Sequence, residues 1–320
     1  MSDEDSVTSE PTTTELTKAE DVAVATSSDG GSSYFAPSTS EAADERRRAL
    51  DPGFWSTTGR FFGTVGTAIG HAAVKTGQSA VAAYQAVDPD ARRHLAQLPV
   101  MGLSMLGPRD STVEPLPDDN HRPIVMVHGL AGHPGNFMAL RQYLALKGRT
   151  RVYTINFGSA ESLDLMAAML RDFIATVVER NELGAADQVD ILAHSMGGLV
   201  TRLAIEDADT AARIGTVITL ATPHSGTYTA RLGAKTPTTE LRPESAVIER
   251  LAHQLPWSDH PELPRLVALW SASDLIVLPG EGGQVPGAEN IELPGYTHYS
   301  YFLEPDAWRL VNRVLLGGQG

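Results

Sequence analysis

The sequence predicts an α/β fold with a mostly parallel central sheet and helices on both of its faces. From residue 121 onward, short runs of β-favouring residues alternate with helix-patterned segments of 10 to 20 residues. One such run, residues 189–194, stops at the pentapeptide from Ala193 to Gly197, and a helical pattern begins directly behind it. Connections of this length favour parallel strands whose crossover helices cover both faces of the sheet.

The pentapeptide has Ser195 at its centre and the pattern of a nucleophile elbow. In such an elbow the strand turns into a helix so tightly that the residues two before and two after the serine must be small. Ala193 and Gly197 meet that requirement. The serine hydroxyl is then pushed out over the edge of the sheet. The backbone N–H of Met196, at the start of the helix, points to where a negative oxygen would form.

The predicted strands and helices of the main domain follow one another from residue 121 to 320. The strands are expected at residues 124–127, 151–157, 189–194, 214–220, 266–271 and 290–293. The helices are expected from a cap at Asn136 to a stop at Gly148, at 162–183, from the elbow to about Ala208, and at 305–316. About 45 residues separate two of the strands, between 221 and 265. That length predicts a cap at about 226–262 whose apolar residues line an acyl pocket, or else a helical excursion packed on the domain.

The N-terminal third differs in composition from the main domain. Residues 1–45 hold 11 of the 39 acidic residues and one lysine, so the remainder carries only about −4 of the total charge of −14, which is unfavourable for nucleic-acid binding. Residues 1–50 are polar and are predicted to be a disordered tail. They have no basic start and no apolar core of a secretory signal, and the chain has no cysteine. These features favour the cytoplasm over secretion.

Residues 51–107 are rich in small and apolar residues and are predicted to form a helical preface. Gly59, Gly63, Gly66 and Gly70 recur at helical spacing, which lets another surface come close. The apolar run at 61–74 has 14 residues, too few to span ~30 Å of hydrocarbon. We expect the preface to pack on the main domain, with peripheral contact to a membrane or lipid surface as the alternative. A linker follows at 108–120, and Pro99 is assigned to the same proline-rich stretch.

A serine nucleophile requires an imidazole to take its proton and a carboxylate to orient that imidazole. Asp274 follows the predicted strand at 266–271, and His298 follows the last predicted strand and is the only histidine after Asp274. Both therefore fall at the carboxyl ends of strands, in the order serine, acid, histidine. Structural roles are favoured for four other histidines and one aspartate, which are His128, His194, His224, Asp259 and His260. His128 and His133 have no third ligand nearby, so no metal or cofactor is expected.

Five motifs together resemble the α/β-hydrolase superfamily, specifically the bacterial lipase and esterase group whose elbow begins with alanine. They are V-H-G-L-A-G-H-P-G-N-F, A-H-S-M-G-G-L-V, A-T-P-H-S-G-T, W-S-A-S-D-L-I-V-L-P and G-Y-T-H, spread over residues 121–316. The resemblance implies that Ser195 is the nucleophile, Asp274 the orienting acid and His298 the general base. It also implies an oxyanion hole formed by the N–H groups of Leu130 and Met196. The sequence departs from many relatives at Thr297, where they have glycine.

These observations predict a carboxylic-ester hydrolase of the lipase or carboxylesterase type. It would act on lipid or other acyl esters of apolar character, through an acyl-serine intermediate and without a cofactor. An acyltransferase using the same triad is the first alternative. The second is a catalytically silent α/β-hydrolase that serves as an interaction module, with the acidic tail as its contact region. The sequence indicates no oligomeric state.

Overall fold

The computed structural model describes residues 88–104, 111–158 and 160–317, all of which belong to the unit of residues 38–320. The predicted tail at 1–50 and residues 51–87 of the predicted preface lie outside the described residues. The first described helix is α4 (Pro89–Ser104). It runs through Pro99, so the assignment of that proline to a linker is wrong, and the helix accommodates the ring in its interior.

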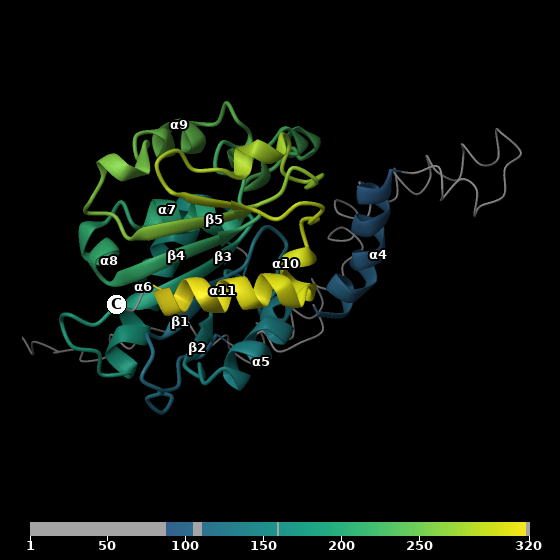
Figure 1. Cartoon of the computed structure of the whole chain (residues 1–320). Coiled ribbons are helices and arrows are strands. Elements are labelled where there is room, and N and C mark those ends of the chain that lie inside the picture. The colour runs from purple at the N-terminus through teal and green to yellow at the C-terminus, as the bar shows by residue number, and fades with distance from the viewer. Residues whose placement is uncertain (1–87, 105–110, 159, 318–320) are drawn as a thin grey trace, which may run out of the picture. The chain divides into compact units, whose positions relative to one another are not determined.

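Six parallel strands form one sheet in the order β2-β1-β3-β4-β5-β6 (Figure 1). This confirms the predicted parallel α/β architecture. The central strand β3 pairs with β1 on one side and β4 on the other. The strands are β1 (Ile124–Val127), β2 (Val152–Thr154), β3 (Val189–His194), β4 (Ile214–Leu220), β5 (Arg265–Trp270) and β6 (Glu289–Glu292).

Three strands have the predicted bounds and three differ from them. β5 and β6 each begin and end one residue earlier than predicted. β2 ends at Thr154 instead of residue 157, because a turn follows it. The side chain of Asn156 accepts a hydrogen bond from the N–H of Gly158, and Gly158 has a positive φ of 55°. This local turn competes with continued pairing and ends the strand.

One face of the sheet is covered by α5 (Met138–Leu146), α10 (Ser300–Leu303) and α11 (Pro305–Gly317), and Figure 1 shows α11 in front of the strands. The rings of Phe137 and Phe302 meet edge to face at 5.0 Å within this core. The predicted cap at Asn136 is wrong. Asn136 lies inside a 3-10 helix, η1 (Pro134–Phe137), which is capped by the side chain of His133. Pro134 at its first position is suited to start such a turn, because the ring fixes φ and no N–H is needed there.

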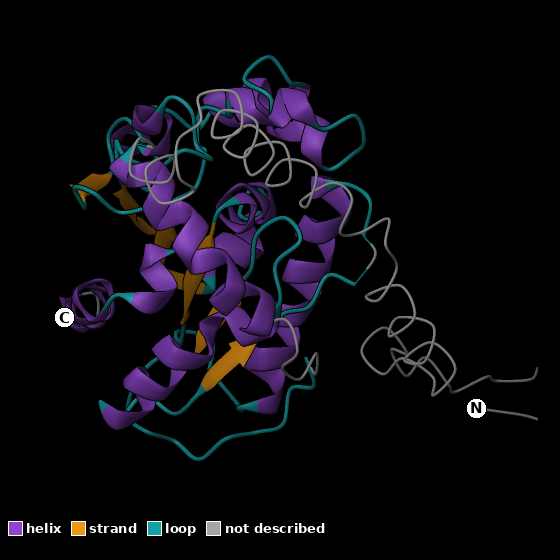
Figure 2. Cartoon of the chain, turned by 90° about the vertical axis from the view of Figure 1, so that its right-hand side faces the viewer, coloured by secondary structure: helices purple, strands orange, loops and turns teal. Residues whose placement is uncertain are grey.

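The opposite face is covered by α6 (Leu163–Arg180), α7 (Met196–Ala204) and α8 (Ala208–Ala212), so helices flank the strands on both sides (Figure 2). The nucleophile helix α7 ends at Ala204, four residues before the predicted end. A new helix, α8, begins at Ala208. The carboxylate of Asp207 caps it by accepting a hydrogen bond from the N–H of Thr210, at 2.8 Å.

The segment between β4 and β5 forms four short helices and packs on the domain. They are η2 (Tyr228–Leu232), η3 (Thr238–Leu241), α9 (Ala246–Ala252) and η4 (Trp257–Asp259). The buried guanidinium of Arg202 in α7 donates to the side chain of Gln254, which donates in turn to the Arg202 carbonyl. The apolar residues expected to line an acyl pocket are mostly buried, namely Leu241, Val247, Ile248, Leu251 and Trp257. This burial agrees with the alternative of a packed helical excursion.

Within the described part of the chain, no helix has both the length and the apolar character needed to cross a membrane.

Candidate active site

Ser195 occupies a strained turn at the carboxyl edge of the sheet. It follows β3 directly, caps α7 and has φ 54° and ψ −128°. A positive φ is uncommon for a residue with a side chain and is held only where the surroundings enforce it. Here the N–H of Ser195 donates to the carbonyl of Leu220 at 2.8 Å, and its carbonyl accepts from Gly198 at 3.0 Å. The turn therefore has the strained geometry expected of a nucleophile elbow.

Two glycines let the elbow press against the loop that follows β1. A Cβ atom on Gly197 would lie 2.5 Å from the carbonyl oxygen of Val127, closer than real contacts allow. A Cβ atom on Gly129 would lie 2.7 Å from the Cβ of Ser195. The backbone just before Leu130 is thus packed against the serine. An oxyanion hole formed by the N–H groups of Leu130 and Met196 would require this loop to lie close to the serine, and their role stays a prediction.

Asp274 and His298 form a buried pair on the loops after β5 and β6. The Nδ1 of His298 lies 2.8 Å from the Oδ2 of Asp274. The Oδ1 atom accepts hydrogen bonds from the N–H groups of Ile276 and Val277, at 2.8 and 3.1 Å. Burial alone would raise the pKa of Asp274, but the adjacent His298, and to a lesser degree His94 and the N–H of Ile276, hold it well below its usual range. The carboxylate is therefore ionised and fixes the proton of His298 on Nδ1.

His194 connects the elbow to the loop that carries His298. Its Nε2–H donates to the carbonyl oxygen of His298 at 2.8 Å, and the two rings meet edge to face at 4.7 Å. Burial, together with the nearby His298, lowers the pKa of His194 to about 3, so its ring is neutral at neutral pH. In the described part of the chain, the Ser195 hydroxyl makes no hydrogen bond to the His298 ring. The two residues are connected through His194, which precedes Ser195 and hydrogen-bonds to the backbone of His298.

The remaining histidines considered from the sequence have local partners. His128 donates from Nδ1 to the carbonyl of Gly129 at 3.0 Å, within its own loop, and burial lowers its pKa. His224 is hydrogen-bonded to the hydroxyl of Thr219, and burial holds its pKa well below the usual value. His260 contacts Glu262 in the segment between β4 and β5. Among the residues that the structure describes, no three or more His, Cys, Asp or Glu side chains are grouped so that they could hold a metal ion.

The sequence assigned only a structural role to His194, and of α4 it singled out only Pro99, as part of a linker. The structure brings His194 and His94 to the two backbone polar groups of His298, since the His298 N–H donates to the Nε2 of His94 at 3.1 Å and the His298 carbonyl accepts from His194. The position of His194 beside the serine was the one signal for its role. Nothing in the pattern of α4 marks His94, because the contact spans 204 residues of sequence.

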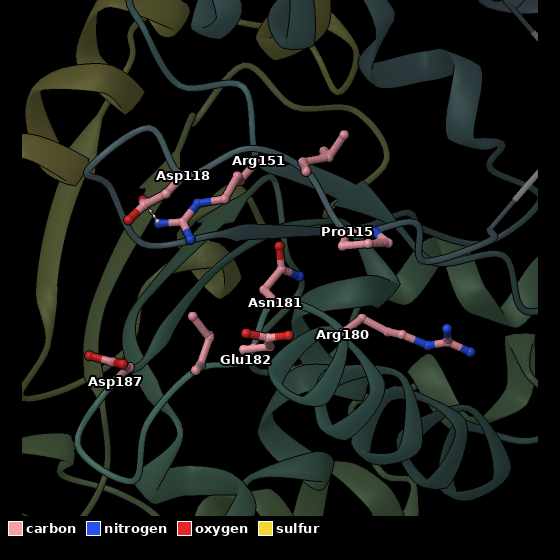
Figure 3. A pocket seen from close by; sticks show the side chains of 9 residues that line it. Pro115, Asp118, Arg151, Arg180, Asn181, Glu182 and Asp187 are labelled. Carbon is pink, nitrogen blue, oxygen red and sulfur yellow. Dashed lines mark ion pairs between the residues drawn. The ribbon is translucent and has the colours of Figure 1, made fainter.

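A cavity of about 330 Å³ lies elsewhere, at the amino ends of the strands (Figure 3). Its lining includes Asp118 and Arg151, which form an ion pair at 2.8 Å, and Arg180 and Asp187. Arg151 precedes β2 and Asp187 precedes β3, whereas Ser195, Asp274 and His298 follow the strands. The cavity therefore belongs to the opposite edge of the sheet and takes no part in the candidate active site.

The model of the family described as palmitoyl protein thioesterase matches residues 123–282, half of the chain. The match includes Leu130, Ser195 and Asp274 and ends before His298.

Among solved structures, the mature lipase BlEst2 of Bacillus licheniformis is 17% identical, with a TM-score of 0.53 over 64% of this chain and 96% of the lipase. Lipase B of Aspergillus fumigatus is 19% identical, with a TM-score of 0.51 over 61% of this chain and 52% of that one. At these identities the likeness is one of fold, and that fold is the α/β-hydrolase fold.

Proposed function

Because the chain belongs to the palmitoyl protein thioesterase family, we propose that it is a serine hydrolase that cleaves esters of apolar acyl groups through an acyl-serine intermediate. The observation that carries the proposal is the buried Asp274–His298 pair, joined at 2.8 Å, beside a strained elbow at Ser195. These are the three groups that acyl transfer through a serine requires.

In the first half of the proposed reaction, Nε2 of His298 takes the proton of the Ser195 hydroxyl as the oxygen attacks the acyl carbon. Asp274 stabilises the imidazolium that results and keeps the ring oriented. The N–H groups of Leu130 and Met196 stabilise the negative oxygen of the tetrahedral intermediate. His298 then gives its proton to the leaving alkoxide, and the acyl group stays on Ser195. In the second half, His298 takes a proton from a water molecule that attacks the acyl-serine, and the carboxylic acid is released.

Exposed apolar side chains support an apolar acyl group as the substrate. Leu130, Tyr228 and Leu278 are 40%, 52% and 36% exposed and lie on the segments that follow β1, β4 and β5. Those segments start at the same edge of the sheet as Ser195. The N–H of Tyr228 donates to the carbonyl of Leu278 at 2.9 Å, so two of the segments are in contact. An acyl chain lying on these side chains would remove apolar surface from water on both partners.

The test is an acyl-length series of p-nitrophenyl esters, from acetate to palmitate, measured with the full chain and with Ser195→Ala. A palmitoyl thioester belongs in the series, because the family is named for that bond. Ser225→Ala is the matched control, since Ser225 is an exposed serine in the segment after β4. We expect Ser195→Ala to abolish hydrolysis at an unchanged melting temperature, and the control to retain the wild-type rate.

The same series separates the alternatives when it is repeated with a competing alcohol. Accumulation of a new ester in place of free acid would identify an acyltransferase. If the folded protein hydrolysed none of the esters or the thioester, the alternative of a catalytically silent interaction module would be favoured. A Ser195→Ala variant that keeps more than a few per cent of the rate would remove Ser195 from the reaction.

A further inference from the structure

The loop that carries the proposed base depends on a helix that precedes the main domain. We propose that His94 of α4 is a positioning residue, which holds the loops of Asp274 and His298 in the geometry that proton transfer needs. The inference rests on the proposed function, since it assigns His94 a part in the same reaction. His94 acts through His298 and touches neither the serine nor the acyl group.

The hydrogen bonds of His94 fix its tautomer. The Nδ1 atom lies 3.0 Å from the carbonyl oxygen of Asp90, which can only accept, so Nδ1 carries the proton. The Nε2 atom is then an acceptor. It receives hydrogen bonds from the backbone N–H groups of His298, at 3.1 Å, and of Leu275, at 3.4 Å. A single ring nitrogen thus connects the loop after β5 to the loop after β6.

His94 also lies next to the acid itself. Its Nε2 is 3.9 Å from the Oδ1 of Asp274, and the ring is only 5% exposed. Among the α4 residues whose side chains the structure describes, His94 is the only buried one. A polar side chain buried this deeply is normally one whose hydrogen bonds are satisfied. The burial and the hydrogen bonds together show that α4 is anchored through its histidine at the acid–base pair.

Two further residues of α4 hold the same loop. Arg93 donates to the carbonyl of Gly295 at 2.9 Å. Gln97 donates from its amide nitrogen to the hydroxyl of Ser300 at 3.1 Å and accepts from the hydroxyl of Thr297. These contacts lie on both sides of His298 in the sequence, so α4 holds the whole loop from Gly295 to Ser300.

The loop after β6 has particular need of such support. β6 is a four-residue strand at the edge of the sheet and, among the described strands, pairs with β5 alone. The backbone of His298 is instead held by two histidines, because His94 accepts from its N–H and His194 donates to its carbonyl. Loss of the His94 acceptor would leave the buried N–H of His298 without a partner, which is unfavourable enough to move the loop.

The experiment compares His94→Leu, His94→Gln and His253→Leu in the full chain, with a soluble p-nitrophenyl ester as the substrate. Leucine removes the acceptor, whereas the glutamine carbonyl can reach the position of Nε2. His253 is an exposed histidine at the end of α9 and serves as the matched control. We expect His94→Leu to lower kcat by about 10- to 100-fold with little change in KM, because a small misplacement of the base costs rate and not binding. His94→Gln should restore most of kcat.

A spectroscopic measurement tests the positioning without relying on activity. The Nδ1 proton of His298 in its hydrogen bond to Asp274 should give a far-downfield proton resonance, assigned by its loss in His298→Ala. We expect the resonance to be shifted or broadened in His94→Leu, and to return in His94→Gln.

Three outcomes would overturn the proposal. The first is a His94→Leu variant with the wild-type kcat and an unshifted resonance. The second is equal impairment of His94→Leu and His94→Gln with equal losses of melting temperature, which would show a packing role alone. The third is a raised KM at constant kcat. If the wild-type chain hydrolyses no ester, the proposed function fails, and the resonance still decides the role of His94.

Discussion

The Nε2–H of His194 donates to the carbonyl oxygen of His298 across 2.8 Å, while the two rings meet edge to face at 4.7 Å. The residue that precedes the proposed nucleophile therefore holds the proposed base. Because His194 is the last residue of β3 and Ser195 follows it, any shift of the His298 loop is resisted by the central strand of the sheet. The spacing of nucleophile and base is thus set through the backbone as well as through the Asp274 side chain.

The burial of His194 makes the stability of the fold dependent on pH. Its pKa is lowered to about 3, against about 6.5 in an unfolded chain. Between these values the unfolded state binds a proton that the folded state does not. The free energy of unfolding therefore rises with pH in this window, and the contribution of His194 is lost as the pH falls from about 6.5 toward 3.

We expect His194→Gln to have a flatter decline of stability below pH 6.5 than the wild type. The difference in slope should be on the order of 1 kcal/mol per pH unit, measured by urea unfolding at a series of pH values. His128 and His224 are also buried with lowered pKa values, but they are present in both proteins, so their contributions cancel in the comparison. Parallel curves for the two proteins would show that His194 is not held neutral by the fold.

Asp274→Asn should lower the rate of ester hydrolysis by about 10³- to 10⁴-fold while leaving the fold intact, because the imidazole of His298 loses the carboxylate that fixes its tautomer. The measurement is kcat with a p-nitrophenyl ester, beside a melting curve. Asp259→Asn is the control, since Asp259 is exposed in η4 and hydrogen-bonds to its neighbour Ser258. A nearly neutral Asp274→Asn would take this residue out of the proposed triad.

Gly197→Ala should destabilise the fold by about 1 to 3 kcal/mol, because the added methyl group would meet backbone oxygens that cannot move aside. Its Cβ would lie 2.5 Å from the carbonyl oxygen of Val127 and 2.8 Å from that of His128. Gly102→Ala is the matched control, since a Cβ there meets no atom of the described residues within 4 Å and Gly102 lies in the helix α4. That variant should be neutral or slightly stabilised. Thermal or urea unfolding of both variants checks the contrast, and equal effects would contradict the close approach of elbow and β1 loop.

The sequence was informative where a local pattern determines the structure. The strands β1, β3 and β4 are short β-favouring runs, fully or almost fully buried, and their bounds are as predicted. The elbow is likewise local, because the small residues around Ser195 are needed by the turn itself. Asp274 and His298 were found because parallel strands bring their carboxyl ends to one edge.

The sequence was less informative where a side-chain hydrogen bond determines the structure. The nucleophile helix ends at Ala204, and the carboxylate of Asp207 caps a new helix, α8, from Ala208 onward, while the turn at Asn156 shortens β2. His94 was missed for a stronger reason, because its partners lie about 200 residues away and no periodicity connects them. Long-range polar contacts of this kind leave no pattern in a single sequence.

Asp190 is the second residue of β3. Its burial makes the free energy of unfolding depend on pH with a sign opposite to that of His194. Burial raises its pKa to about 6, although Arg122 and Arg149 oppose that shift. Its Oδ1 accepts from the N–H of Thr216 at 3.0 Å and lies 3.5 Å from the guanidinium of Arg122. Between about pH 4 and 6 the folded state holds a proton at Asp190 that the unfolded state has lost, so this group lowers the free energy of unfolding as the pH rises through that window.

We therefore expect Asp190→Asn to gain stability relative to the wild type as the pH is raised from 4 to 6, at on the order of 1 kcal/mol per pH unit. Loss of the contact with Arg122 would shift the free energy of unfolding of the variant by the same amount at every pH and would not change its slope against pH. Urea unfolding of both proteins across the window measures the difference. A difference that stays constant, or that favours the wild type increasingly toward pH 6, would mean that Asp190 is ionised throughout and that its partners outweigh its burial.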